Sequence, residues 1–83
     1  MWNDRLRIAE SVDADWKSLS PSDRETALTA LQRIDDDPIA GAPLFEPLKG
    51  LWSYRTDDLR IVYRVVADGR FVAILSIARV APV

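Results

Sequence analysis

The stretch that decides the fold is WSYRTDDLRIVYRVVADGRFVAILSIARV, residues 52–80. Polar and apolar residues alternate before and after Asp57-Asp58, and Asp68-Gly69 gives a strong turn signal before an apolar third run. The pattern predicts three consecutive antiparallel strands joined by two hairpins. If Asp57-Asp58 form a two-residue turn, Arg55 lies directly opposite Arg60.

Two arginines that face each other across an antiparallel pair repel, which costs on the order of a few tenths of a kcal/mol. We therefore interpret Arg55 and Arg60 as a candidate anion site. The alternative interpretation is that Asp57, Asp58 or the terminal carboxylate neutralises the pair.

With the second turn at Asp68-Gly69, the register places Val66 opposite Phe71 and Arg60 opposite Ile77. Because side chains alternate between the two sides of a strand, one face is predicted to gather four arginines around Val62, Leu75 and Ile77: Arg55, Arg60, Arg64 and Arg79. Arg64 taken alone is interpreted as a solvated surface residue. The other face is predicted to be an apolar layer that needs a cover: Trp52, Tyr54, Ile61, Tyr63, Val65, Val72 and Ile74.

The first half of the chain supplies that cover. Residues 5–10 alternate and predict a short first strand, and Ser11 is the predicted N-cap of a first helix. Ser20-Pro21 restarts a second helix over residues 21–35, with proline at its first helical position. The apolar residues expected to cover the sheet are Trp16, Leu19, Ala27, Leu28, Leu31 and Ile34.

Residues 38–47 contain three prolines and Gly41, which predicts an ordered loop without regular structure. Its apolar residues, Ile39, Leu44 and Phe45, are expected to tuck against the body. The predicted fold is therefore α+β: a single domain over residues 1–83, with a short N-terminal strand, two helices and a three-stranded meander. Both helices are expected on one face of a twisted antiparallel sheet.

The composition of the chain limits the kinds of site that it can form. The 83 residues are 48% hydrophobic and include no cysteine and no histidine, which excludes disulfides and thiolate metal sites. Asp35-Asp36-Asp37 is interpreted as a polar helix end rather than a metal site, and no cofactor is expected. No apolar run approaches the ~20 residues of a membrane span, so the expected location is cytoplasmic.

The formal net charge of −2 is unevenly placed along the chain. Residues 1–45 hold five basic and nine acidic side chains, a balance of −4, whereas residues 46–83 hold six and four, a balance of +2. A local anion site depends on this distribution more than on the total.

The motif Leu48-Lys49-Gly50, followed by residues 51–55 and then by Leu-Arg-Ile-Val-Tyr-Arg-Val at 59–65, resembles the RelE/ParE superfamily of bacterial and archaeal toxins. The resemblance covers essentially the whole chain. It implies a small toxin encoded beside an antitoxin that wraps and neutralises it. RelE-like members enter the ribosomal A site and cleave mRNA, whereas ParE-like members poison DNA gyrase.

For a RelE-like member the resemblance implies metal-free cleavage, in which the ribose 2′-hydroxyl attacks the adjacent phosphodiester and basic side chains stabilise the phosphate that forms. Arg60 matches the strand arginine that contacts the scissile phosphate, and Arg55 matches a basic residue on the preceding strand. Lys49 matches the basic position of the turn, as a phosphate contact or a proton-transfer group. Arg79 is assigned the basic position that ends the last strand.

Two departures from the family pattern leave the function open. Ser53 replaces a lysine common in the RelE type, and neither tyrosine nor histidine follows Arg79. The arginine face favours an mRNA interferase that inhibits translation, with the antitoxin, the ribosome and mRNA as partners. The missing C-terminal group favours a gyrase inhibitor, or a toxin fold without activity that binds an antitoxin in a hetero-oligomer.

Overall fold

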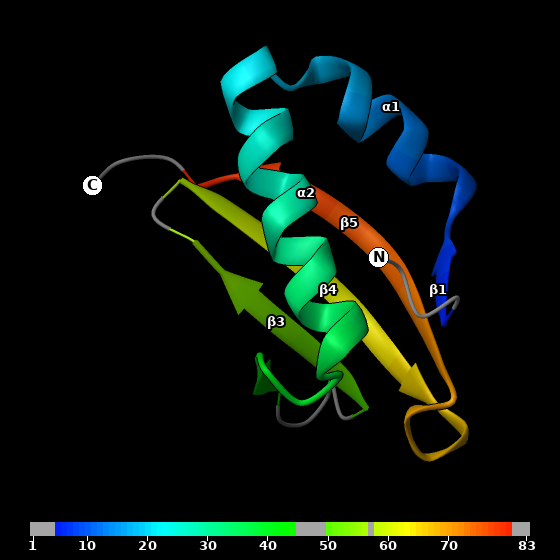
Figure 1. Ribbon diagram of the computed structural model, residues 1–83. Helices are drawn as coiled ribbons and strands as arrows, with labels where there is room; N and C mark the ends of the chain where they lie inside the picture. Colours follow the sequence, from blue (N-terminus) through cyan, green and yellow to red (C-terminus); the bar gives the residue numbers. More distant parts are fainter. Residues whose placement is uncertain (1–4, 45–49, 57, 81–83) are drawn as a thin grey trace.

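The computed structural model of the chain describes residues 5–44, 50–56 and 58–80. Its elements, in chain order, are β1 (Leu6–Ile8), α1 (Glu10–Ser18), α2 (Pro21–Asp36), β2 (Ala42–Pro43), β3 (Leu51–Arg55), β4 (Leu59–Val66), the short 3-10 turn η1 (Ala67–Gly69) and β5 (Phe71–Arg79). The strands form one sheet in the order β1-β5-β4-β3-β2. Both helices lie on the same side of this sheet, with α2 crossing over β4 and α1 beside β5 and β1 (Figure 1).

The α+β class and the single helix layer are confirmed, but the sheet is mixed rather than antiparallel. β1 pairs with β5 in parallel, with Leu6 opposite Val72 and Ile8 opposite Ile74. The first strand is also shorter than predicted: it spans Leu6–Ile8 and not residues 5–10. The two helices and three strands between β1 and β5 provide the long connection that a parallel pair requires.

The start of α2 is as predicted and that of α1 is not. The Ser20 hydroxyl accepts a hydrogen bond from the Asp23 backbone N–H at 3.1 Å, and Pro21 opens the helix. Ser11 is not the N-cap of α1, because the helix already begins at Glu10 with Ala9 in that position. The Ala9 backbone N–H donates to the carbonyl oxygen of Ile74 in β5, which holds the chain extended up to the first helical residue.

The core lies between the helix layer and the facing side of the sheet. Leu28, predicted to face the sheet, is 45% exposed, and Ala30 is buried in its place. The stripe in α2 follows i, i+4 and i+7 from Ala27, which leaves Leu28 on the outer side of the helix. The buried apolar residues are Val12, Leu19, Ala27, Ala30, Leu31, Ile34, Leu59, Ile61, Tyr63, Val72, Ile74 and Ile77.

The proline-rich segment is more regular than predicted and less buried. Ala42 and Pro43 form β2, which pairs antiparallel with Ser53 and Trp52 at the edge of the sheet. Ile39 is 66% exposed, so the expectation that it packs against the body is wrong. Leu44 is half-buried, whereas Phe45 falls outside the described residues.

Tyr63 anchors this segment to the sheet. Its fully buried hydroxyl donates to the Pro38 carbonyl oxygen at 2.9 Å and accepts from the Gly41 backbone N–H at 3.1 Å. A methyl group on Gly41 would lie 2.6 Å from both the Ser53 carbonyl oxygen and the Tyr63 hydroxyl, so the close approach requires glycine. Trp52 and Tyr63, both predicted to lie on the apolar face, are opposite each other, with their rings stacked at 6.4 Å between centroids.

The β4–β5 register begins as predicted and then shifts by one residue. Val66 pairs with Phe71 across a four-residue loop, and Tyr63 pairs with Ile74, but Val62 pairs with Ser76. Leu75 is therefore an extra residue, a β-bulge, and the predicted pairs Val62–Leu75 and Arg60–Ile77 are wrong.

Beyond the bulge every side chain of β5 changes face. Ile77, expected among the arginines, is instead buried in the core. Its backbone N–H donates to the Asp15 carboxylate of α1 at 3.1 Å, which satisfies a donor next to the irregular part of the ladder.

Replacing Tyr63 with phenylalanine keeps the ring and removes the hydroxyl, leaving the Pro38 carbonyl and the Gly41 N–H without that partner. We expect Tyr63→Phe to lower the free energy of unfolding by about 1–3 kcal/mol, measured by urea denaturation. Tyr54→Phe is the matched control, because that ring packs against the core from a partly buried position. Equal stability of the wild type and Tyr63→Phe would contradict the anchoring role.

The same hydroxyl predicts a loss of stability in alkali. Burial raises the pKa of Tyr63 above its usual value of 10.0, Asp37 raises it further, and the hydrogen bond from Gly41 opposes the rise. The folded chain therefore holds this proton more tightly than the unfolded chain, so the stabilisation is complete below about pH 10 and is lost as the pH rises beyond it. In urea denaturation at pH 8 and 11, the wild type should lose more stability than Tyr63→Phe. A parallel decline of the two proteins would show that another group is responsible.

Candidate phosphate-binding face

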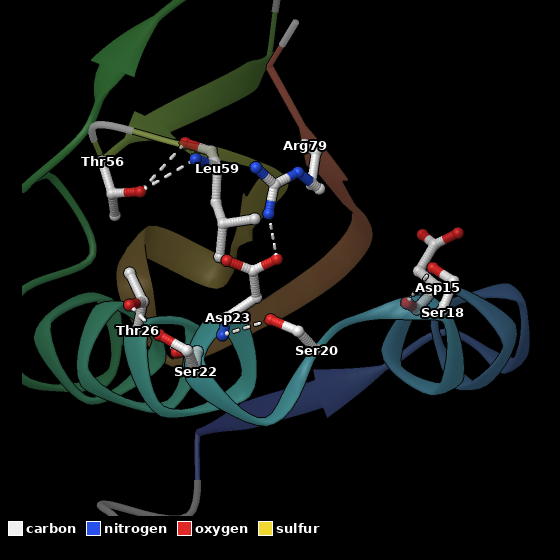
Figure 2. Close-up of polar contacts among 9 residues, drawn as sticks. All are labelled: Asp15, Ser18, Ser20, Ser22, Asp23, Thr26, Thr56, Leu59 and Arg79. Atoms are coloured by element: carbon white, nitrogen blue, oxygen red, sulfur yellow. Dashed lines mark hydrogen bonds and ion pairs between the residues drawn. The ribbon is translucent and has the colours of Figure 1, made fainter.

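The predicted arginine pair is present. Arg55 at the end of β3 lies directly opposite Arg60 near the start of β4, and both side chains are exposed on the side of the sheet away from the helices. The turn between them is closed by Thr56 and Leu59. The Thr56 backbone N–H donates to the Leu59 carbonyl oxygen at 2.9 Å. The Leu59 N–H donates to the Thr56 hydroxyl at 2.9 Å, as Figure 2 shows. These two bonds fix the register that brings the arginines together.

Within residues 5–44, 50–56 and 58–80 no carboxylate forms a salt bridge with either arginine. The two ion pairs recorded there join Lys17 to Asp13 and Arg79 to Asp23. Asp58, one of the proposed neutralising residues, is exposed and makes no ion pair with the arginines. Asp57 and the terminal carboxylate fall outside the described residues. The described surroundings therefore leave the positive charge of the pair open to solvent.

Charge is divided between the two layers of the fold. The five described strands carry five arginines and no acidic residue, whereas α1 and α2 together carry seven acidic and three basic residues. Because the layers bear opposite charge, the net charge of −2 conceals a basic sheet and an acidic helix layer. We call the solvent-facing side of the sheet that bears Arg55, Arg60 and Arg64 the arginine face.

Arg79 does not belong to the arginine face, which corrects its predicted place. The Leu75 bulge turns it toward the helices, where its guanidinium forms an ion pair with the Asp23 carboxylate of α2 (Figure 2). The Asp23 side chain is 10% exposed and that of Arg79 is 58% exposed. The sequence marks Asp23 as an acid in the first turn of a helix, and it gives no sign of the ion pair between Asp23 and Arg79.

Two more residues bear on the site: Lys49, which was predicted from the sequence, and Ser76, which was not. Lys49 falls outside the described residues, so its role stays a prediction. Ser76 was not foreseen, because the bulge brings it opposite Val62 in β4, and Ser53 lies on the other side of Val62. Two hydroxyl-bearing residues thus share one cross-strand row with Val62 on the arginine face.

This arrangement can bind and stabilise negative charge. Arg guanidinium groups present planar sets of donors that match phosphate oxygens, and they stay protonated throughout the physiological range. Tyr54 and Tyr63 both lie on the helix side of the sheet, in or against the core. The described strands therefore place no group on the arginine face that would exchange a proton near pH 7.

The described residues contain no group of three or more side chains suited to holding a metal ion. None of the helices among them is both long and apolar enough to traverse a lipid bilayer.

The chain is similar to known toxins in sequence and in structure. A family model described as the ParE toxin of the type II toxin–antitoxin system parDE matches residues 4–81. Comparison with curated proteins gave no match.

Among solved structures, one similar chain comes from the toxin–antitoxin complex RelBE2 of Mycobacterium tuberculosis, with 25% identity, a TM-score of 0.82, and coverage of 90% of this chain and 95% of that one. The YoeB/ParE toxin from Agrobacterium tumefaciens has 25% identity and a TM-score of 0.75, covering 93% and 99%. The isolated RelE toxin of E. coli shares the fold at 20% identity and a TM-score of 0.76, covering 94% and 85%.

The different surroundings of Arg79 and Arg60 predict opposite effects on stability. Arg79→Ala leaves the largely buried Asp23 carboxylate without its ion-pair partner, and we expect the free energy of unfolding to fall by about 1–2 kcal/mol. Arg60→Ala removes one of two facing like charges and should leave it unchanged or raise it by a few tenths of a kcal/mol. Urea denaturation of both variants measures the difference. If Arg60→Ala destabilises the chain as much as Arg79→Ala, Arg60 is a structural partner and not part of an open anion site.

Proposed function

The chain belongs to the ParE toxin family of type II toxin–antitoxin systems, within the RelE/ParE superfamily, and from that premise we propose that it is a toxin that cleaves mRNA on the ribosome. The observation that carries the proposal is the exposed Arg55–Arg60 pair, which no described carboxylate neutralises. A turn closed by Thr56 holds the two like charges together, although they repel. An anionic ligand relieves that repulsion, and a phosphodiester is the anion that an mRNA substrate supplies.

In the proposed reaction the ribose 2′-oxygen forms a bond to the adjacent phosphorus, and the bond from phosphorus to the 5′-oxygen of the next nucleotide breaks. The products are a 2′,3′-cyclic phosphate and a 5′-hydroxyl end, and the proton of the 2′-hydroxyl ends on the leaving oxygen. Negative charge builds up on the phosphoryl oxygens in the transition state. Arg55 and Arg60, which lie directly opposite each other on adjacent strands, supply the electrostatic stabilisation.

The arginines of this face do not supply the proton transfer that the proposed reaction requires. Arginine does not deprotonate in proteins, so Arg55 and Arg60 are charge-stabilising groups rather than general bases. Lys49, which precedes β3 in the sequence, is proposed as a phosphate contact or proton-transfer group. General acid–base catalysis contributes typically 10²–10⁴-fold, so we propose that the ribosome aligns the 2′-hydroxyl and that cleavage is slow compared with complete RelE-like members.

We propose a cognate antitoxin as the protein partner, as in the RelBE2 complex of Mycobacterium tuberculosis. A mostly apolar cavity of about 200 Å³ lies beside the edge strand, lined by Ile8, Val12, Trp16, Leu31, Ile77 and Asp13. Ile8 is 54% exposed although it borders the core. An amphipathic helix or an added strand is the kind of segment that covers such an apolar surface.

Inhibition of DNA gyrase is the second candidate function. The family model that matches is that of ParE toxins. In addition, Arg79 is held by Asp23 on the helix side, so the basic residue expected at the end of the last strand is absent from the arginine face. Under this alternative the arginine face serves binding alone.

Induced expression in cells separates the two functions. If the chain is an mRNA interferase, incorporation of labelled methionine should stop before plasmid supercoiling changes. Primer extension should then reveal cuts in translated messages. Arg60→Ala should lower the cleavage rate by about 10²–10³-fold, the usual cost of removing one transition-state donor.

Arg33→Ala is the matched control, because it removes an exposed arginine from α2 and leaves the sheet untouched. Loss of supercoiling with translation intact would assign the chain to the gyrase inhibitors. Toxicity that Arg60→Ala leaves unchanged would contradict the proposed role of the arginine face in either function.

A further inference from the structure

The end of β5 borders the turn that joins the two strands of the arginine pair. The last residue of β5, Arg79, pairs with Leu59 at the start of β4. The residue after it, Val80, donates its backbone N–H to the Asp58 carbonyl oxygen at 2.8 Å. Because Asp58 lies in the β3–β4 turn, the end of β5 is hydrogen-bonded to the turn itself.

This contact matters because the arginine pair has strand support on one side. Within the described part of the chain, β2 pairs with Trp52 and Ser53 of β3 and does not extend to the turn. Arg55 is therefore paired with β4 alone, where it lies opposite Arg60. Since the two guanidinium groups repel, keeping them together depends on how firmly β4 is held at this end.

The ion pair between Arg79 and Asp23 connects the end of β5 to α2. Asp23 lies in the first turn of α2, where its backbone N–H donates to the Ser20 hydroxyl. The side chains of Arg79 and the fully buried Leu59 both point toward Asp23 (Figure 2). A guanidinium–carboxylate bond is charge-assisted, and solvent screens it little when the carboxylate is largely buried. Through this bond, α2 holds the strand that borders the turn.

We infer that Arg79 is a positioning residue: its ion pair with Asp23 holds the end of β5 and so keeps Arg55 and Arg60 facing each other. The inference rests on the proposed function. It gives Arg79 a part in that function although its guanidinium lies on the helix side of the sheet. Without the ion pair, repulsion between the two arginines should loosen the turn and spread them apart.

Hydrogen exchange of backbone amides tests this role in the free chain. The amides of Thr56 and Val80 report on the turn, whereas those of Ala9 and Gly41 are bonded elsewhere in the fold. In Arg79→Ala we expect exchange at the two turn amides to be faster by about 5–30-fold, with a much smaller change at the two reference amides. Equal acceleration at all four would indicate a loss of overall stability alone and would overturn the inference.

Two variants control for stability and for charge. Ala30→Gly weakens α2 about two turns beyond Asp23 and should accelerate the turn amides no more than the reference amides. Arg79→Lys keeps the positive charge and should restore most of the protection at the turn. If Arg79→Ala does not fold, Arg79→Gln takes its place. Turn amides that exchange as fast in Ala30→Gly or in Arg79→Lys as in Arg79→Ala would contradict the role of the ion pair.

Cleavage of mRNA on the ribosome distinguishes positioning from direct contact with RNA. Arg79→Ala and Asp23→Asn should each lower the cleavage rate by about 10–10²-fold, because small displacements of a catalytic group cost that much. The double variant should be no slower than the slower single variant, because both changes break one interaction. If Arg79 itself touched the RNA, Asp23→Asn would release it, and cleavage would be unchanged or faster. That result would overturn the inference.

The two measurements also separate this inference from the proposed function. Wild-type cleavage rates in both Arg79→Ala and Asp23→Asn would overturn the positioning role and leave mRNA cleavage standing. Absence of cleavage by the wild type would overturn the proposed function. Faster exchange at the turn in Arg79→Ala would then still support a role for Arg79 in positioning the arginine pair for another anionic partner.

Discussion

One extra residue in β5, Leu75, determines which side chains form the core and which stay on the arginine face. Without the bulge, strand alternation would place Ile77 in solvent and Arg79 among the other arginines. With it, Ile77 is buried and Arg79 reaches the Asp23 carboxylate of α2. The same irregularity leaves a backbone donor that Asp15 of α1 satisfies. The bulge thus ties both helices to the sheet and separates a structural arginine from the exposed ones.

The fold also separates charge by layer. Acidic residues gather on the helices and arginines on the strands, so a chain of net charge −2 presents a basic surface on one side. Repulsion between Arg55 and Arg60 is tolerated because the turn at Thr56 and the buried contacts of β4, Tyr63 among them, hold the register. The stable core therefore holds the two like charges in place before an anionic ligand binds.

The sequence predicts what depends on local patterns. Alternation and turn dipeptides predicted the three-stranded meander, the Arg55–Arg60 pair and the place of Trp52 and Tyr63 on the apolar face, and Ser20-Pro21 predicted the start of α2. What it missed depends on contacts between distant segments. No local signal marks the bulge at Leu75, the parallel pairing of β1, or the Asp23–Arg79 ion pair, because each is selected by how the helices dock on the sheet. Lys49 lies outside the described residues, so its proposed role rests on the sequence alone.

The central claim is that the arginine face, and not the arginine held by Asp23, contacts the nucleic acid. The most direct measurement is NMR observation of the arginine side-chain Nε–H signals while an uncleavable single-stranded RNA is added. We predict that the signals of Arg55, Arg60 and Arg64 shift, whereas those of Arg24, Arg33 and Arg79 stay in place. Shifts of Arg79 or of the helix-layer arginines, with Arg55 and Arg60 unmoved, would contradict it.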